Sequence, residues 1–174
     1  MRKFSFHSKT QRLCVLALMS AFALIIFTVE AQIPLPIAVP GLKLGLSNVI
    51  TLYMLCTFSP VDALAVLAVR ILLGSMFAGQ AVSLFYSLCG GLLAFIAMAV
   101  FLRLSRFQNI WFAGVLGAVL HGVGQLCAAA VLYRSVYVFT YLAVLTFFSV
   151  FTGLLTGITA QLLASRNSSN NKEE

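Results

Sequence analysis

Long apolar runs alternate with short polar breaks along this chain, and the pattern predicts its secondary structure. A helix that crosses a bilayer needs about 20 apolar residues, with a lower limit of about 17. In hydrocarbon only helices or a closed barrel satisfy the backbone, and the runs lack the two-residue alternation of barrel strands. We therefore predict an all-α membrane protein with six transmembrane helices, over residues 13–29, 44–58, 63–78, 81–102, 110–132 and 136–164. The second and third runs are short and carry polar groups, so their ends are the least well defined.

Composition supports the membrane assignment. Hydrophobic residues make up 61% of the 174 residues and charged residues only 9%, with a mean hydropathy of +1.05. A soluble domain of this length cannot bury so much apolar surface in a single core. We therefore expect a lipid bilayer to surround most of the chain.

The charges predict the orientation. With six spans, most of the basic residues fall on one side of the membrane, and the positive-inside bias makes that side cytoplasmic. These residues are Arg2, Lys3, Lys9, Arg12, Arg103, Arg106, Arg166 and Lys172. The prediction is a multi-pass protein of a bacterial-type cell membrane with both termini cytoplasmic. Its parts are a basic N-terminus (residues 1–12), a transmembrane domain (residues 13–164) and a disordered tail (residues 165–174). The chain has no basic face in which aromatic residues alternate with basic ones, so we do not expect nucleic acid as a partner.

The loop between the first two runs, residues 31–42, contains three prolines and a glycine and cannot be regular helix. It is apolar although it lies on the outer side. Two interpretations remain open, a lid over a pocket from Gln32 to Gly41 or simple packing on the helix ends. Asp62, in the turn on the cytoplasmic side, is a candidate cap for the third helix.

Polar residues gather in the outer half of the predicted bundle, whereas the inner half is almost purely apolar. An intramembrane arginine costs about 2.5–3.5 kcal/mol on insertion scales and is a functional hypothesis by default. For Arg70 the alternatives are an anion or polar-ligand site and a structural bridge to Glu30 or to backbone carbonyls. For His121 and Asn48 the alternatives are ligand contact and helix packing. The candidate substrate-binding residues are Lys43, Asn48, Arg70, Tyr86, His121 and Gln125.

The sequence offers no catalytic or metal-binding set. Glu30 and Asp62 fall on opposite sides of the membrane, and the four cysteines lie in four different runs without a CxxC pair. We therefore expect neither an enzyme nor a cofactor. There is no nucleotide-binding loop, so ATP-driven transport would need another chain.

Small residues at four-residue spacing allow helices to approach closely in lipid. Gly153 and Gly157 form such a pair on the last helix, where intramolecular packing is the expected role. Ala17 and Ala21 form another on the first helix. For that pair, packing within the bundle and docking of a partner protein are both open.

Four blocks together carry a family resemblance. They are Pro40-Gly41-Leu42-Lys43-Leu44-Gly45-Leu46-Ser47-Asn48, Arg70-Ile71-Leu72-Leu73-Gly74-Ser75, Ser83-Leu84-Phe85-Tyr86-Ser87-Leu88-Cys89-Gly90-Gly91 and Gly117-Ala118-Val119-Leu120-His121-Gly122-Val123-Gly124-Gln125-Leu126. They resemble the family labelled both "Gx transporter" and "heptaprenyl diphosphate synthase component I". That family is in turn similar to the substrate-binding S-components of energy-coupling factor (ECF) transporters.

The resemblance implies a six-helix importer subunit that binds a small molecule in its outer half, under its first loop. It also implies partners, namely a transmembrane coupling protein contacted by Ala17 and Ala21 and two ABC ATPases. The substrate would be vitamin-like or an isoprenoid or quinone precursor. The other label implies a membrane accessory subunit of polyprenyl diphosphate synthesis. A solitary proton-coupled carrier is a weaker third hypothesis, since only Glu30 and His121 could relay protons.

Overall fold

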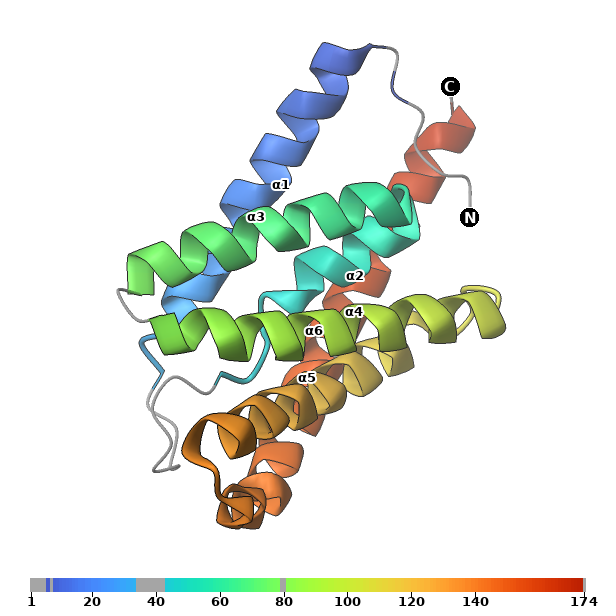
Figure 1. The fold of residues 1–174 in the computed structure, drawn as a ribbon. Helices are drawn as coiled ribbons and strands as arrows, with labels where there is room; N and C mark the ends of the chain where they lie inside the picture. The colour runs from blue at the N-terminus through green and yellow to red at the C-terminus, as the bar shows by residue number, and fades with distance from the viewer. Residues whose placement is uncertain (1–5, 7, 34–42, 79–80, 174) are drawn as a thin grey trace.

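The computed structural model describes the backbone at residue 6 and over residues 8–33, 43–78 and 81–173. Within these ranges the chain is helical and contains no strand, so the all-α prediction is confirmed (Figure 1). The elements are α1 (Lys9–Glu30), α2 (Asn48–Thr57), α3 (Pro60–Ala78), α4 (Ala81–Leu104), α5 (Ile110–Tyr133), the 3-10 helix η1 (Val136–Tyr141) and α6 (Leu142–Glu173).

Five of these helices, α1, α3, α4, α5 and α6, are long and apolar enough to cross a membrane. The second predicted span is shorter than expected, because α2 has only 10 residues. At 1.5 Å per residue it covers about 15 Å, half of a hydrocarbon core. The run that precedes it does not extend the helix, since Gly45 has a φ of +85°, which a right-handed helix excludes.

Successive helices run in alternating directions (Figure 1). In this view α1 starts at the top, α3 and α5 start on the right-hand side, and α6 ends at the upper right. The first residue of α1 and the last residues of α6 therefore belong to the same side of the bundle.

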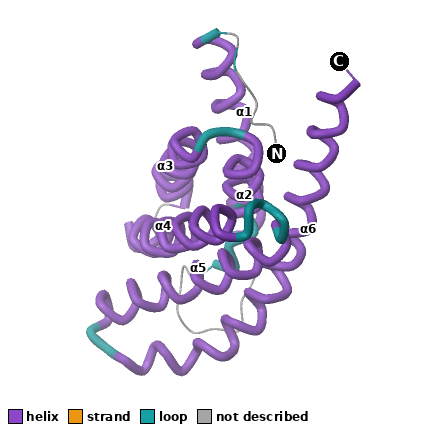
Figure 2. The backbone as a smooth tube through the Cα atoms, turned by 90° about the vertical axis from the view of Figure 1, so that its right-hand side faces the viewer, coloured by secondary structure: helices purple, strands orange, loops and turns teal. Residues whose placement is uncertain are grey.

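Glycines set the contact between α5 and α6, which lie side by side (Figure 2). A Cβ on Gly114 would lie 2.5 Å from the Cα of Gly157, and one on Gly157 would lie 2.3 Å from the carbonyl oxygen of Trp111. No side chain fits at either position, so the two backbones touch directly. The predicted intramolecular role of Gly153 and Gly157 is confirmed.

An ion pair joins the starts of α1 and α3. Arg12 Nη2 lies 2.5 Å from Asp62 Oδ1, and Arg12 Nε donates to the same oxygen at 2.7 Å. The helix cap is Ser59 rather than Asp62, because the Ser59 hydroxyl accepts the Asp62 N–H at 3.1 Å. The Asp62 carboxylate in turn accepts the Ser59 hydroxyl at 2.7 Å, which holds the capping side chain in place.

The backbone of α6 remains helical to Glu173, where the composition predicted a disordered tail over residues 165–174. Once a helix is nucleated, each added residue gains a hydrogen bond, so a helix can continue past its apolar segment.

Candidate ligand-binding site

Buried polar side chains from α1, α3 and α5 meet around the start of α2. Arg70 of α3 lies at the centre and is 1% exposed. Its Nη1 donates to the Ser47 hydroxyl and lies 3.4 Å from Asn48 Oδ1. No nitrogen of Arg70 comes within 4.0 Å of a Glu30 oxygen, since Arg12–Asp62 is the one ion pair among the described residues. The arginine is thus held by neutral oxygens instead of the bridge to Glu30 that the sequence suggested.

Glu30, at the end of α1, binds the backbone that precedes α2. Its two carboxylate oxygens accept the N–H groups of Gly45 and, at 3.4 Å, Ser47. Gly45 has no room for a side chain, because a Cβ there would lie 2.8 Å from Asn48 Nδ2 and 3.0 Å from His121 Cδ2. The carboxylate and the glycine together fold residues 43–47 against α1 and α5.

Lys43 carries the second buried cation, and it lies outside the helices. Its Nζ is 3.2 Å from the centroid of the Phe27 ring, a cation–π contact worth about 2 kcal/mol when desolvated. The ring fits because α3 has a glycine there, as a Cβ on Gly74 would lie 2.6 Å from Phe27 Cε1.

Gln125 and His121 connect α5 to this cluster. Gln125 Oε1 accepts the Lys43 backbone N–H at 3.1 Å, and its Nε2 lies 3.1 Å from His121 Nε2. The amide nitrogen must donate there, which assigns an acceptor Nε2 to a neutral His121 imidazole. The α4 backbone approaches closely at Gly90, where a Cβ would lie 2.8 Å from the His121 carbonyl oxygen.

Four donors of the cluster are buried and make no hydrogen bond within the described structure. They are Lys43 Nζ, Asn48 Nδ2, Arg70 Nε and the Nδ1–H that the assigned tautomer gives to His121. Each unsatisfied buried donor costs about 1–3 kcal/mol, more when it is charged. With Lys43, Arg70 and Glu30 ionised, the cluster carries a net charge of +1. The arrangement is therefore suited to a ligand that brings hydrogen-bond acceptors and negative charge.

Tyr86 of α4 is fully buried but belongs to a neighbouring hydrophobic cluster. Its neighbours there include Leu44, Leu126 and Leu145. The structure thus brings five of the six predicted site residues into one polar cluster and places Tyr86 in the apolar wall beside Lys43 and Leu44.

The site also contains residues that sequence reasoning did not select. Phe27 supports Lys43, Ser47 accepts from Arg70, and Gly45, Gly74 and Gly90 make room for neighbouring side chains and backbone. A glycine in an apolar helix of a membrane protein is the available signal, since it marks a close approach. The predicted lid, Gln32 to Gly41, lies almost entirely in residues 34–42, which are outside the described residues.

Ala17 and Ala21 lie apart from this cluster, on the exposed side of α1. They line a groove of about 520 Å³ between α1 and α3, with Leu13, Leu16, Ser20, Leu24, Ala65, Val66, Val69 and Leu73. The groove is open, so no helix of the described structure packs over the two alanines.

Comparison with known proteins gives one match. A family model described as "Heptaprenyl diphosphate synthase component I" matches residues 19–163, well over half of the chain. Neither the curated proteins nor the solved structures give a match. The matched range includes all six predicted site residues and most of the helical bundle. The chain belongs to the heptaprenyl diphosphate synthase component I family.

Proposed function

We propose that this protein is the substrate-binding membrane subunit of an ECF-type ABC importer, which captures a small molecule on the outer side of the cell membrane. The observation that carries the proposal is the buried cluster around Arg70, with four donors that make no hydrogen bond within the described structure. Burying such groups without partners is costly, and native proteins rarely do so without a ligand, water or ion to pair them. The substrate-binding residues would be Lys43, Asn48, Arg70, His121 and Gln125, with Tyr86 in the wall.

The orientation follows from the positive-inside bias. Arg12 lies at the start of α1 and Arg103 in the last turn of α4, and these helix ends lie on the same side of the bundle (Figure 1). We propose that this side is cytoplasmic. The cluster lies toward the other end, where α1 ends and α2 begins, which we propose is the outer side. In this arrangement α2 would not cross the membrane unaided, and residues 43–47 would complete its path.

The open groove between α1 and α3 supports a partner. A transmembrane coupling protein would pack a helix against Ala17 and Ala21, where small side chains permit close approach. Two ABC ATPases would supply the energy, since we expect this chain to perform no chemistry itself. Substrate candidates are a vitamin-like molecule or an isoprenoid or quinone precursor.

A second candidate function has one observation in its favour, the description of the matching family. In that case the chain would be a membrane accessory subunit associated with polyprenyl diphosphate synthesis. It would hold the product or a catalytic subunit at the membrane.

The test is purification of the tagged protein from its own membranes in mild detergent, with mass spectrometry of what accompanies it. Two ABC ATPases with a second membrane protein are the expected result. A prenyl synthase catalytic subunit without ATPases would replace the import proposal with the accessory-subunit one. The matched variants are Ala17→Leu with Ala21→Leu, which should release the coupling protein, and Ile158→Leu on exposed α6, which should not.

A further inference from the structure

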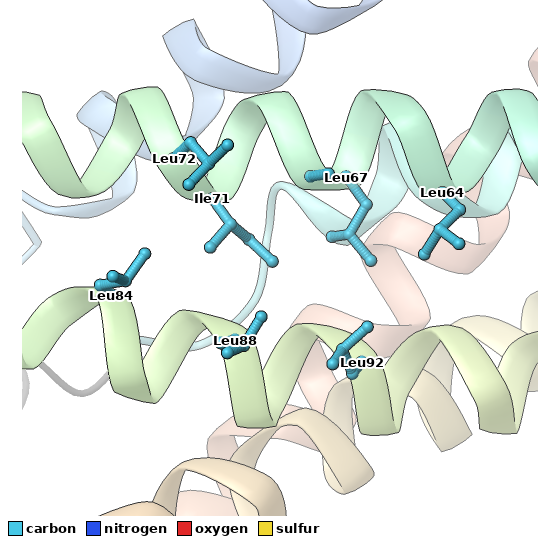
Figure 3. A pocket seen from close by; sticks show the side chains of 8 residues that line it. Leu64, Leu67, Ile71, Leu72, Leu84, Leu88 and Leu92 are labelled. Atoms are coloured by element: carbon cyan, nitrogen blue, oxygen red, sulfur yellow. The ribbon is translucent and has the colours of Figure 1, made fainter.

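An apolar groove of about 250 Å³ runs between α3 and α4, on the lipid-facing side of the bundle. Figure 3 shows leucine side chains of the two helices leaning toward one another across it. Leu67 and Ile71 form its buried floor, whereas Leu72 and Leu88 are 58% and 43% exposed at its rim. The lining is Leu64, Leu67, Ala68, Ile71, Leu72, Leu84, Leu88 and Leu92. It contains no polar side chain, so it is suited to a hydrocarbon chain.

The floor of this groove adjoins the cation cluster at Gly91 of α4. A Cβ on Gly91 would lie 3.1 Å from Ile71 Cδ1, 3.3 Å from Leu67 Cδ1 and 3.4 Å from Arg70 Nη2. One point on the α4 surface is thus in contact with both floor residues and with the guanidinium. Because residue 91 has no side chain, Leu67, Ile71 and Arg70 all approach the same part of the α4 backbone.

The donors and the charge of the cluster indicate which polar group a ligand would carry. Four atoms of the cluster make no hydrogen bond within the described structure, and all are donors: Lys43 Nζ, Asn48 Nδ2, Arg70 Nε and His121 Nδ1. The carboxylate of Glu30 already accepts two backbone N–H groups and leaves a net charge of +1. A carboxylate or phosphate group matches this set, since a guanidinium and an ammonium bind such oxygens with charge-assisted hydrogen bonds.

We infer that the cluster and the groove form one binding site for an amphiphilic anion. Its acidic head binds Arg70, Lys43 and Asn48, and its single apolar chain lies between α3 and α4. The inference rests on the proposed function, because it assigns a substrate class to the same site. A prenyl diphosphate is a representative of this class.

The number of chains distinguishes such a ligand from a bulk phospholipid. Arg70 lies eight residues before the end of α3, or about 12 Å along the helix at 1.5 Å per residue, and any acidic head has to reach this depth. A phospholipid would also have to bring a second chain with it. A single-chain amphiphile enters from the outer end and needs only one apolar groove.

The test uses the full chain in lipid nanodiscs and equilibrium dialysis with farnesyl diphosphate, inorganic pyrophosphate and farnesol, each corrected with empty nanodiscs. Farnesyl diphosphate should bind saturably and at least tenfold more tightly than pyrophosphate or farnesol. Lys43→Gln should weaken both diphosphates at least fivefold, and Arg70→Gln at least tenfold if it folds. Leu88→Trp fills the groove and should weaken farnesyl diphosphate at least fivefold but leave pyrophosphate unchanged. Ile158→Trp is the matched control on the lipid-facing side of α6 and should change neither.

Each of the contrary results would overturn one stated part of this inference. Equal binding of both diphosphates, reduced equally by Lys43→Gln, would leave an anion site and remove the chain from it. Equal binding of farnesol and farnesyl diphosphate, indifferent to Lys43→Gln, would make the groove an ordinary lipid contact. Absence of saturable binding by every probe would overturn the inference while the import proposal is still decided separately by the co-purified ATPases.

Discussion

The contact between α5 and α6 gives a prediction whose magnitude follows from the structure. In Gly157→Ala the new Cβ would lie 2.3 Å from the carbonyl oxygen of Trp111, 2.8 Å from its Cα and 2.9 Å from its carbonyl carbon. Ordinary van der Waals contact begins at 3.4 Å, so the shortfall against the oxygen is 3.4 − 2.3, about 1.1 Å. All three atoms are backbone, so no side-chain rotation relieves the clash and the helices must separate.

Two effects of this substitution oppose each other. Overpacking of a tight contact costs about 1–3 kcal/mol. Alanine is favoured over glycine inside a helix by about 0.8–1.0 kcal/mol, which acts in the stabilising direction. The clash is the larger effect because separating the helices at residue 157 also loosens the neighbouring close contacts at Gly114 and Gly153, where a Cβ would lie 2.5 Å from backbone atoms. We expect a net loss of about 1–2 kcal/mol, or roughly 2–8 °C in the unfolding midpoint for a chain of this size.

The assay is thermal unfolding in detergent followed by the fluorescence of Trp111, the single tryptophan of the chain. The indole belongs to the first turn of α5, directly at the substituted contact, so a shift of its emission in the folded state should accompany the lower midpoint. The control is Ile158→Val, the neighbouring residue, whose side chain is 50% exposed toward lipid. A midpoint for Gly157→Ala equal to or above that of the parent protein would refute the close backbone contact.

Three further predictions concern other parts of the fold. Ser59→Ala removes the α3 cap and should cost about 1 kcal/mol in the same unfolding assay, whereas Ser59→Asp should restore most of it. Glu30→Gln removes one of the two acceptors that hold the N–H groups of Gly45 and Ser47 and should cost about 1–3 kcal/mol, and an unchanged stability would show that the carboxylate is not needed there. In a cysteine-free background, a membrane-impermeant maleimide on intact cells should label Arg134→Cys, which follows α5, and not Arg106→Cys, which precedes it. The reverse pattern would invert the proposed orientation.

The sequence by itself determined the all-α fold class and five residues of the polar cluster. Hydropathy is a local property, so the apolar runs locate α1, α3, α4 and α5 to within a few residues of their observed ends, whereas α6 begins six residues and ends nine residues later than predicted. The depth of a residue in the membrane also follows from the sequence, because each helical residue rises by a fixed distance from the end of its span. Polar residues of different spans can therefore be assigned to the same depth. For these reasons Lys43, Asn48, Arg70, His121 and Gln125 were selected together, and they do converge.

The partners of each polar group were decided only by the tertiary structure. Arg70 bonds Ser47 and Asn48 instead of Glu30, because Glu30 is occupied by the backbone of residues 45–47. The shortness of α2 likewise depends on the positive φ of Gly45, and the place of the Lys43 ammonium depends on Phe27. Such contacts depend on how the helices cross and rotate against one another. Close approaches at glycines set those crossings, and hydrophobic periodicity, which records only that a face is buried, does not specify what it is buried against.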